Sequence, residues 1–122
     1  MQEIATRALQ AALDAGASYA DVRVQEIETE SLAVRNAILE TAERSASAGI
    51  GVRILVDGAW GFAATSELEG AGASEVARRA VEVGQASALL KRHDVRLGPA
   101  DPQQGAYETP VEEDPFGIPL SE

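Results

Sequence analysis

The sequence has no cysteine and only one histidine, His93, among its 122 residues. The absence of cysteine excludes disulfides, thiolate metal ligands and cysteine nucleophiles. A zinc site without cysteine needs two or three histidines with carboxylates at defined spacing, so we expect no zinc site within these residues. His93 follows Lys91 and Arg92, and we interpret it as a solvated residue near a helix end, where cations complement the helix dipole.

Long hydrophobic runs are also missing from the chain. No run approaches the ~20 apolar residues that a membrane-spanning helix needs. Residues 1–4 have neither the basic start nor the apolar stretch of a signal peptide. We therefore expect a cytoplasmic protein that has no membrane partner.

Basic residues are scarce, with ten against twenty acidic ones and a net charge of −10. A surface of this sign repels phosphate backbones, so we expect no nucleic-acid partner. Residues 98–122 contribute six acidic residues, no basic residue and all five prolines, a composition that is unfavourable for a packed core. We predict an α+β domain over residues 1–97 and an extended acidic linker or tail over residues 98–122.

The spacing of apolar residues predicts a helix at each end of this domain. Between Gln2 and Ala15 the apolar residues form one helical stripe, and Gly16 follows at the position of a left-handed C-cap. The second helix is predicted to begin with Ser74 as N-cap. It is predicted to have residues 91–93 in or near its last turn and to be stopped by Gly98 and the proline that follows.

Between the helices the period changes to two, which is typical of half-buried strands. The predicted strands cover residues 19–25, 31–35, 37–47, 50–56 and 60–65, with an acidic interruption at residues 26–30. Asp57 and Gly58 predict a tight hairpin turn. We expect an α+β fold in the order α-β-β-β-β-(β)-α, with two helices packed on one face of an antiparallel meander.

A few residues stand out as candidates for a site. Trp60 and Phe62 share one face of the last strand, and the usual role of such a pair is packing in the core or against another domain. Arg23 and Arg53 lie in the polar phase of their strands, so they either pair with acids across the sheet or face a partner. We treat Arg23 and Trp60 as candidate contacts to an interface or a peptide.

Three segments carry a family resemblance. They are GASYADVR from Gly16, SAGIGVRI from Ser47 with its continuation DGAWGFAAT, and EDPFGIPLSE at residues 113–122. Together they resemble the N-terminal region of the TldD/PmbA family, also called modulators of DNA gyrase, and the middle segment is closer to the TldD branch. The resemblance covers essentially the whole chain.

The resemblance implies a parent protein that is a zinc-dependent metalloprotease acting on peptides or unfolded proteins, in a dimer with a TldD/PmbA-type partner subunit. Zinc is expected only in that parent, because the family's ligands lie downstream in an H-E-x-x-x-H motif and a later cysteine. No catalytic or metal-binding residue is carried over to this chain. The matched residues carry over as structural features only: Gly49 and Gly51 at the start of a strand, Gly58 at the turn, Gly61 in the return strand, with Arg53 and Phe62 beside them.

Three functions are compatible with these residues. The first is a non-catalytic N-terminal domain, inactive alone, that packs on the metal domain of its own parent chain, supports the dimer and holds peptide substrate at a sheet edge. The second is a stand-alone module that binds proteins or peptides and has no protease domain. The third, a double-stranded-RNA-binding domain, shares the order of elements but needs a basic face, which the charge of −10 disfavours.

Overall fold

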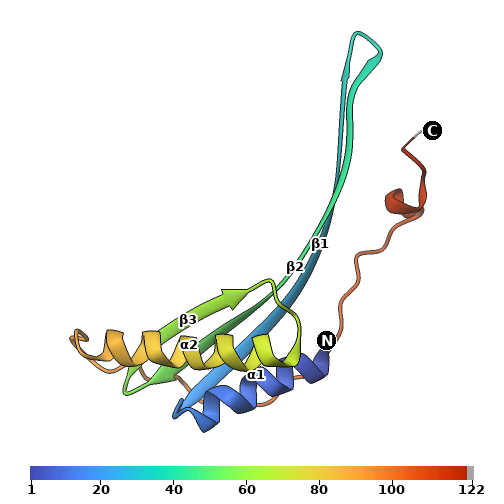
Figure 1. The fold of residues 1–122 in the computed structure, drawn as a ribbon. Coiled ribbons are helices and arrows are strands. Elements are labelled where there is room, and N and C mark those ends of the chain that lie inside the picture. The colour runs from blue at the N-terminus through green and yellow to red at the C-terminus, as the bar shows by residue number, and fades with distance from the viewer. Residues whose placement is uncertain (121–122) are drawn as a thin grey trace. The chain divides into compact units, whose positions relative to one another are not determined.

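A computed structural model describes residues 1–120 of the chain. Its elements are α1 (Gln2–Asp14), β1 (Tyr19–Arg35), β2 (Ile38–Val56), β3 (Ala59–Thr65), α2 (Gly70–Ala88) and the 3-10 helix η1 (Pro115–Gly117). The three strands form one sheet in the order β1-β2-β3 (Figure 1). The expected α+β class is confirmed. None of the described helices is long and apolar enough to cross a membrane.

The chain divides into two compact units. The first contains Met1–Ile27 and Ser47–Leu97, and therefore both α-helices and β3. The second contains Glu28–Ala46 and the chain from Gly98 onward. The strands β1 and β2 contribute residues to both units, so each unit is described separately below.

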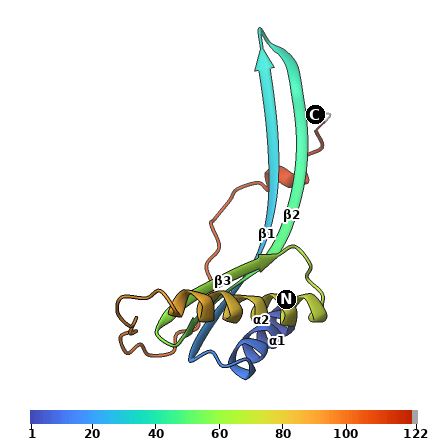
Figure 2. The same cartoon turned by 60° about the vertical axis from the view of Figure 1, so that its left-hand side comes forward.

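In the first unit, α1 and α2 lie side by side against one face of the sheet (Figures 1 and 2). Alternate residues of β2 point at them and are almost completely buried, namely Ile50, Val52, Ile54 and Val56. The helices meet this row with small side chains that have no exposed surface: Ala8, Ala12, Ala73, Ala77 and Ala80. Because alanine projects so little from a helix, both helices approach the sheet closely.

The end of α1 matches its prediction. Gly16 has a φ of +110°, which glycine adopts without the penalty of a Cβ. The Gly16 N–H donates to the Leu13 carbonyl at 3.1 Å, and the Ala17 N–H donates to the Ala12 carbonyl at 3.1 Å. This pair of bonds is a Schellman motif, which satisfies two carbonyls that the helix end leaves free.

The boundaries predicted for α2 were wrong at both ends. The helix begins at Gly70 with Glu69 as N-cap, and the Glu69 carbonyl accepts from the Ala73 N–H at 3.0 Å, so the first turn is closed before Ser74 is reached. At the other end the helix stops at Ala88, well before residues 91–93. Leu89 and Leu90 are each 86% exposed, so further turns would bury no apolar surface and gain little stability.

The sheet has three strands where four or five were predicted, because β1 and β2 are continuous. The acidic run at residues 26–30 does not interrupt β1: Glu26 and Glu28 are exposed and Glu30 is only half-buried. A strand tolerates charges along one side when that side meets water. Residues 37–47 and 50–56 likewise belong to the one strand β2. Gly49 and Gly51 therefore lie inside a strand, not at its start as predicted.

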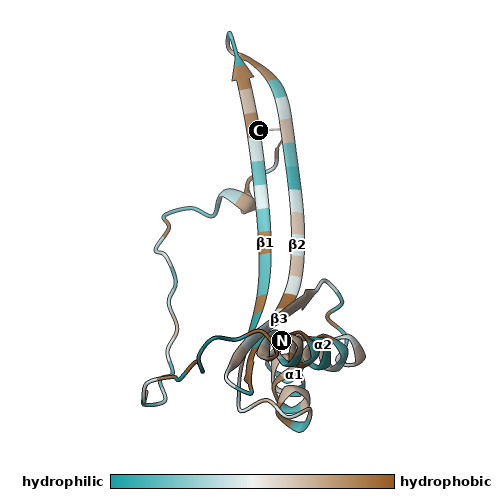
Figure 3. Ribbon diagram, turned by 90° about the vertical axis from the view of Figure 1, so that its left-hand side faces the viewer, coloured by the Kyte–Doolittle hydropathy of each residue, from teal (hydrophilic) through white to brown (hydrophobic). Residues whose placement is uncertain are grey.

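In the second unit, residues 28–46 form a hairpin without a helical layer. Its turn residues Asn36 and Ala37 have φ values of +51° and +61°, the pattern of a type I′ turn, which matches the twist of the flanking strands. Near the turn, hydrophobic segments recur along both strands (Figure 3). Their large apolar side chains are 51% to 68% exposed: Leu32, Val34, Ile38 and Leu39.

The tail of the second unit is held by Arg44 of the hairpin. Its guanidinium makes an ion pair with Glu30 at 3.1 Å, donates to the carbonyls of Pro115 and Ile118, and lies 6.0 Å from the centre of the Phe116 ring. The Asp114 carboxylate accepts from the Phe116 N–H at 3.0 Å and thereby caps η1. The tail thus includes one turn of 3-10 helix where only extended chain was predicted.

Candidate functional site on the outer face of the sheet

The face of the sheet that points away from the helices carries most of the candidate residues of the first unit. Side chains alternate between the two faces of a strand, and Val52 and Ile54 point toward the helices. The neighbours of these residues therefore point to the outer face. This outer face comprises Tyr19, Asp21, Arg23 and Gln25 of β1, Gly51, Arg53 and Leu55 of β2, and Trp60, Phe62 and Ala64 of β3.

Arg53 is the centre of a cluster on this face. Its Nε and Nη2 atoms donate to one Asp21 carboxylate oxygen at 2.9 and 2.7 Å. The guanidinium lies 4.8 Å from the centre of the Trp60 ring, in cation–π geometry. The Tyr19 ring packs edge-on against Trp60 with ring centres 6.3 Å apart. Hydrogen bonding and charge attraction from Asp21 raise the pKa of Arg53 above its ordinary value.

The Arg53–Asp21 pair positions side chains more than it stabilises the fold. Both partners are substantially exposed, with 53% and 40% of their side-chain surface in contact with solvent. Exposed ion pairs contribute about 0–1 kcal/mol, because water screens the charges. The ion pair holds the guanidinium over Trp60, and the Asp21 carboxylate neutralises its positive charge. Arg53 therefore presents little net charge to a ligand.

Phe62 lies over Gly51, and this contact explains the glycine inside β2. A Cβ built on Gly51 would lie 3.2 Å from two atoms of the Phe62 ring. Phe62 pairs with Arg53, and Ala64 pairs with Gly51, so the ring crosses diagonally to cover the glycine. The Phe62 side chain nevertheless remains 60% exposed. Of the two roles expected for Phe62 and Trp60, packing in the core is excluded, because both point away from the helices, and packing against another domain stays a prediction.

A cavity of about 530 Å³ opens on this face. Its lining comes from all three strands: Asp21, Arg23, Gln25, Ile27, Ser47, Ala48, Gly49, Ile50, Gly51, Arg53, Phe62, Ala64 and Thr65. Gly49 and Gly51 add no side chains to this part of the face, and the Phe62 ring covers Gly51 at one side of the cavity. Its charged lining residues are two arginines and one aspartate, a net charge of +1 within a chain of net −10.

The strand β3 is an edge of the sheet, since it pairs only with β2 in the order β1-β2-β3. Its seven residues, AWGFAAT, include no charge and no proline. Natural proteins usually protect an edge strand with charged residues, proline or a bulge, because its free N–H and C=O groups pair readily with another strand. The opposite edge, β1, carries several charges. Of the two edges, β3 is the better suited to pairing with an extended chain.

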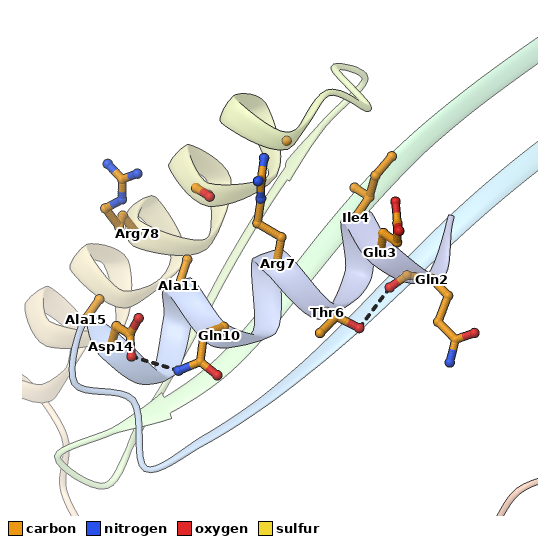
Figure 4. A pocket seen from close by; sticks show the side chains of 12 residues that line it. Gln2, Glu3, Ile4, Thr6, Arg7, Gln10, Ala11, Asp14, Ala15 and Arg78 are labelled. Carbon is orange, nitrogen blue, oxygen red and sulfur yellow. Dashed lines mark hydrogen bonds between the residues drawn. The ribbon is translucent and has the colours of Figure 1, made fainter.

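The larger hollow of the first unit lies between α1 and α2 and is about 1100 Å³ (Figure 4). Two of its polar side chains bond within α1: Gln10 donates to Asp14 at 2.8 Å and Thr6 donates to the Gln2 carbonyl at 2.9 Å. The guanidinium of Arg7 occupies the space where a side chain at Gly70 would be. This hollow is an open groove between solvent-facing helix surfaces and brings no reactive groups together.

The turn between β2 and β3 is a structural site. Asp57 and Gly58 have φ values of +49° and +74°, so the predicted hairpin turn is confirmed. The segment after α2 fastens it: the Val95 N–H donates to the Gly58 carbonyl at 2.9 Å, Lys91 donates to the Asp57 carbonyl, and Lys91 forms an ion pair with Asp94 at 2.8 Å. The hydrogen bond from Lys91 lowers the pKa of Asp94 below its ordinary value.

The predicted site residues divide into two groups. The outer-face cavity brings together Gly49, Gly51, Arg53, Phe62 and Arg23, with Trp60 beside Arg53. Gly58 lies at the turn, and Gly61 lies on the opposite face against α2. Asp21 and Tyr19 were not named as site residues from the sequence. Their alternation with the apolar Ala20 and Val22 could have placed both on the face that carries Arg23. Arg44 was missed as well, and no local pattern distinguishes it from other exposed arginines.

A metal centre has no support from the described residues. Within residues 1–120, no three side chains of histidine, cysteine, aspartate or glutamate are grouped so that they could hold an ion. The expectation that zinc belongs to the parent protein stays a prediction.

Comparison with known proteins identifies the fold. A protein-family model described as PmbA/TldA metallopeptidase domain 1 matches residues 20–84, which is 65 of the 122 residues. The chain belongs to the PmbA/TldA family. The matched region of this PmbA/TldA domain begins in β1 and ends in α2, so it contains the turn at Gly58 and the outer-face cavity. A search of curated protein sequences found no significant match.

Among solved structures, the PmbA/TldA domain is similar to the crystal structure of TldE from Thermococcus kodakarensis, with a TM-score of 0.59 at 14% sequence identity. The match covers 89% of this chain and 23% of that chain. The likeness therefore establishes a shared fold, and the chain spans less than a quarter of that relative's length.

Proposed function

We propose that this chain acts as the non-catalytic N-terminal domain of a TldD-like zinc metalloprotease and holds extended peptide segments along β3. The observation that carries the proposal is the uncharged edge of β3 beside an outer face that contains Trp60, Phe62 and a cavity. An extended peptide adds to such an edge through main-chain hydrogen bonds, which do not depend on its sequence. Alternate side chains of the peptide would then project over the outer face.

Within the parent protein, zinc and the reactive groups belong to the metal domain. The N-terminal domain formed by this chain binds peptide and supports the assembly. The family-model match supports this division, since it places residues 20–84 in domain 1 of a metallopeptidase family. We further propose that the isolated domain has no peptidase activity, and that the parent functions in the cytoplasm.

The hairpin of the second unit supports a role in assembly. A two-stranded hairpin is marginally stable in water, and this one exposes four large apolar side chains near its turn. We propose that these side chains pack against another part of the parent chain or against a TldD/PmbA-type partner subunit. Burial of such a cluster is a favourable term in protein association.

The experiment is hydrogen exchange of the domain with a short uncharged peptide of high β-propensity. Addition to β3 should slow exchange of the β3 amides and leave those of α1 unchanged. The control is the same peptide with alternate backbone nitrogens methylated, which removes the donors that strand pairing requires. Equal protection by both peptides, or protection centred on β1, would contradict the proposal. A peptidase assay on the domain alone should show no cleavage.

A further inference from the structure

Among the described residues, Arg23 is the charged group of the outer-face cavity that forms no ion pair. The structure contains ion pairs at Arg44, Arg53 and Lys91, and within residues 1–120 none involves Arg23. Arg23 is exposed and lines the cavity from β1, opposite Phe62, Ala64 and Thr65 of β3. The neighbouring Arg53 is already bound to Asp21. The net positive charge of the cavity therefore resides on Arg23.

We propose that this cavity binds the side-chain carboxylate of a glutamate in an extended peptide, with Arg23 as its ionic partner. The inference rests on the proposed function, because it assumes a peptide paired with β3. A guanidinium binds a carboxylate through two parallel N–H···O bonds. In an acidic chain, a locally positive cavity is complementary to an acidic side chain, while the surface around it repels acidic groups elsewhere.

Distances within the sheet favour glutamate over a shorter acid. Neighbouring strands lie about 4.8 Å apart, so about 14 Å separates the backbone of a peptide added to β3 from that of β1. An arginine side chain from β1 and a glutamate side chain from the peptide, pointing toward each other, span this gap between them. Aspartate lacks one methylene and would fall short.

Other groups of the cavity fit the same ligand. The methylene groups of a glutamate would pack on the exposed ring of Phe62, which covers Gly51. Ser47, in phase with Gly49 and Gly51 on β2, supplies a hydroxyl in the lining. A carboxylate between β3 and Arg23 would thus meet an arginine and one hydroxyl donor.

The test uses fluorescence anisotropy with four labelled, C-terminally amidated peptides. They share one extended sequence and carry Glu, Asp, Gln or Lys at its central position. The chain should bind the Glu peptide about fivefold to tenfold more tightly than the Gln peptide, and the preference should weaken as salt screens the charges. Arg23→Gln should abolish it, and Arg23→Glu should make the Lys peptide the preferred one. Arg35→Gln, which removes the same charge from β1 outside the cavity, should leave it intact.

The outcomes separate this inference from the proposed function. If none of the peptides binds, the proposed function fails. If all four bind equally and Arg23→Gln changes nothing, peptide holding stands and the glutamate site is overturned. A fifth peptide, with Gln at the centre and a free C-terminus, tests the other source of a carboxylate. Preference for that peptide over its amidated form, lost in Arg23→Gln, would assign the cavity to peptide C-termini and overturn the proposal for glutamate.

Discussion

Gly61 of β3 and Gly84 of α2 are in direct backbone contact. A Cβ on Gly61 would lie 2.5 Å from the Gly84 nitrogen and 2.8 Å from its Cα, and closer still to the Ala80 carbonyl oxygen. A Cβ on Gly84 would instead meet the side-chain ends of Ile54 and Val56, at 2.6 and 2.8 Å. The two glycines therefore set the distance between the helix layer and the sheet.

Gly61→Ala should destabilise the first unit by about 1–3 kcal/mol or more, because the new methyl group meets helix backbone that cannot move aside. Gly84→Ala should cost less, since the methyl group meets flexible side-chain ends and alanine favours a helix by about 1 kcal/mol over glycine. Urea denaturation measures both. Gly105→Ala is the control, because no atom lies within 4 Å of its added Cβ. A smaller loss for Gly61→Ala than for Gly84→Ala would contradict the packing described here.

Gly58→Val should lower the stability of the β2–β3 turn by about 1–3 kcal/mol, since a β-branched residue is strained at positive φ. The new side chain would also displace Asp94, whose Oδ1 lies 2.6 Å from the position of a Cβ on Gly58. The melting temperature should fall accordingly. Gly98→Val, which has open space around it, should leave the melting temperature unchanged. An unchanged melting temperature for Gly58→Val would show that the turn does not require positive φ.

Ala37→Gly should stabilise the hairpin of the second unit by about 0.5–1 kcal/mol. Ala37 has a φ of +61°, a left-handed conformation that costs an L-residue with a Cβ about 1–2 kcal/mol. The amides of residues 28–46 should exchange more slowly in the variant. Asn36→Gly should gain less, because asparagine tolerates this conformation. Faster exchange in Ala37→Gly would mean that flexibility of the unfolded turn outweighs the relief of strain.

Asp94 should make stability depend on pH on the acidic side. Lys91 lowers the pKa of Asp94 below the ordinary value of 3.8, so the interaction stabilises the fold above pH 3.8 and is lost as the pH falls through the lowered pKa. The difference in melting temperature between the wild type and Asp94→Asn should be small at neutral pH, since both partners are exposed. It should vanish when the pH falls below the lowered pKa of Asp94. A difference that grows toward low pH would have the opposite sign and exclude this ion pair.

Deletion of residues 98–122 should leave the first unit folded, with a cooperative unfolding transition and a melting temperature lowered modestly at most. The first unit ends at Leu97, and the deleted segment is acidic and rich in proline. A point variant, Arg44→Ala, tests the same attachment without a deletion, because it removes the hydrogen bonds to the carbonyls of Pro115 and Ile118. It should increase protease cleavage within residues 98–120 without changing the melting temperature. A molten or insoluble deletion product would make the tail part of the core.

The sequence was informative where a local rule determines the structure. Alternation at Ile50, Val52 and Ile54, the pair Asp57-Gly58 and the glycine at position 16 each have a local physical cause, and all three predictions were confirmed. The start of α2 was missed because Ser74 is a good N-cap by itself, while burial of Gly72 and Ala73 against the core extends the helix to Gly70. Competition between local capping and distant burial is invisible in a single sequence.

The outer face could be predicted only in part, because the packing of helices against one face of a sheet depends on residues far apart in the sequence. Alternation placed Arg53 in the polar phase of its strand and put Trp60 and Phe62 on one face of theirs, but it does not tell which face of the sheet a helix layer will cover. Packing in the core was one of the two roles expected for Trp60 and Phe62, which share one face of β3. The helices instead took the face with Gly61 and Ala63, where small residues allow a closer approach.

The position of Trp60 makes the protein its own optical probe. It is the only tryptophan of the chain, and it lies half-buried between the Arg53 guanidinium and the Tyr19 ring, next to the cavity and away from the core. Its emission will therefore respond to whatever occupies the outer face, even where the helices do not change. Tryptophan fluorescence reports the surroundings of Trp60 and far-ultraviolet circular dichroism reports the helical layer, so coincident unfolding curves by both would show that the outer face and the helices unfold together.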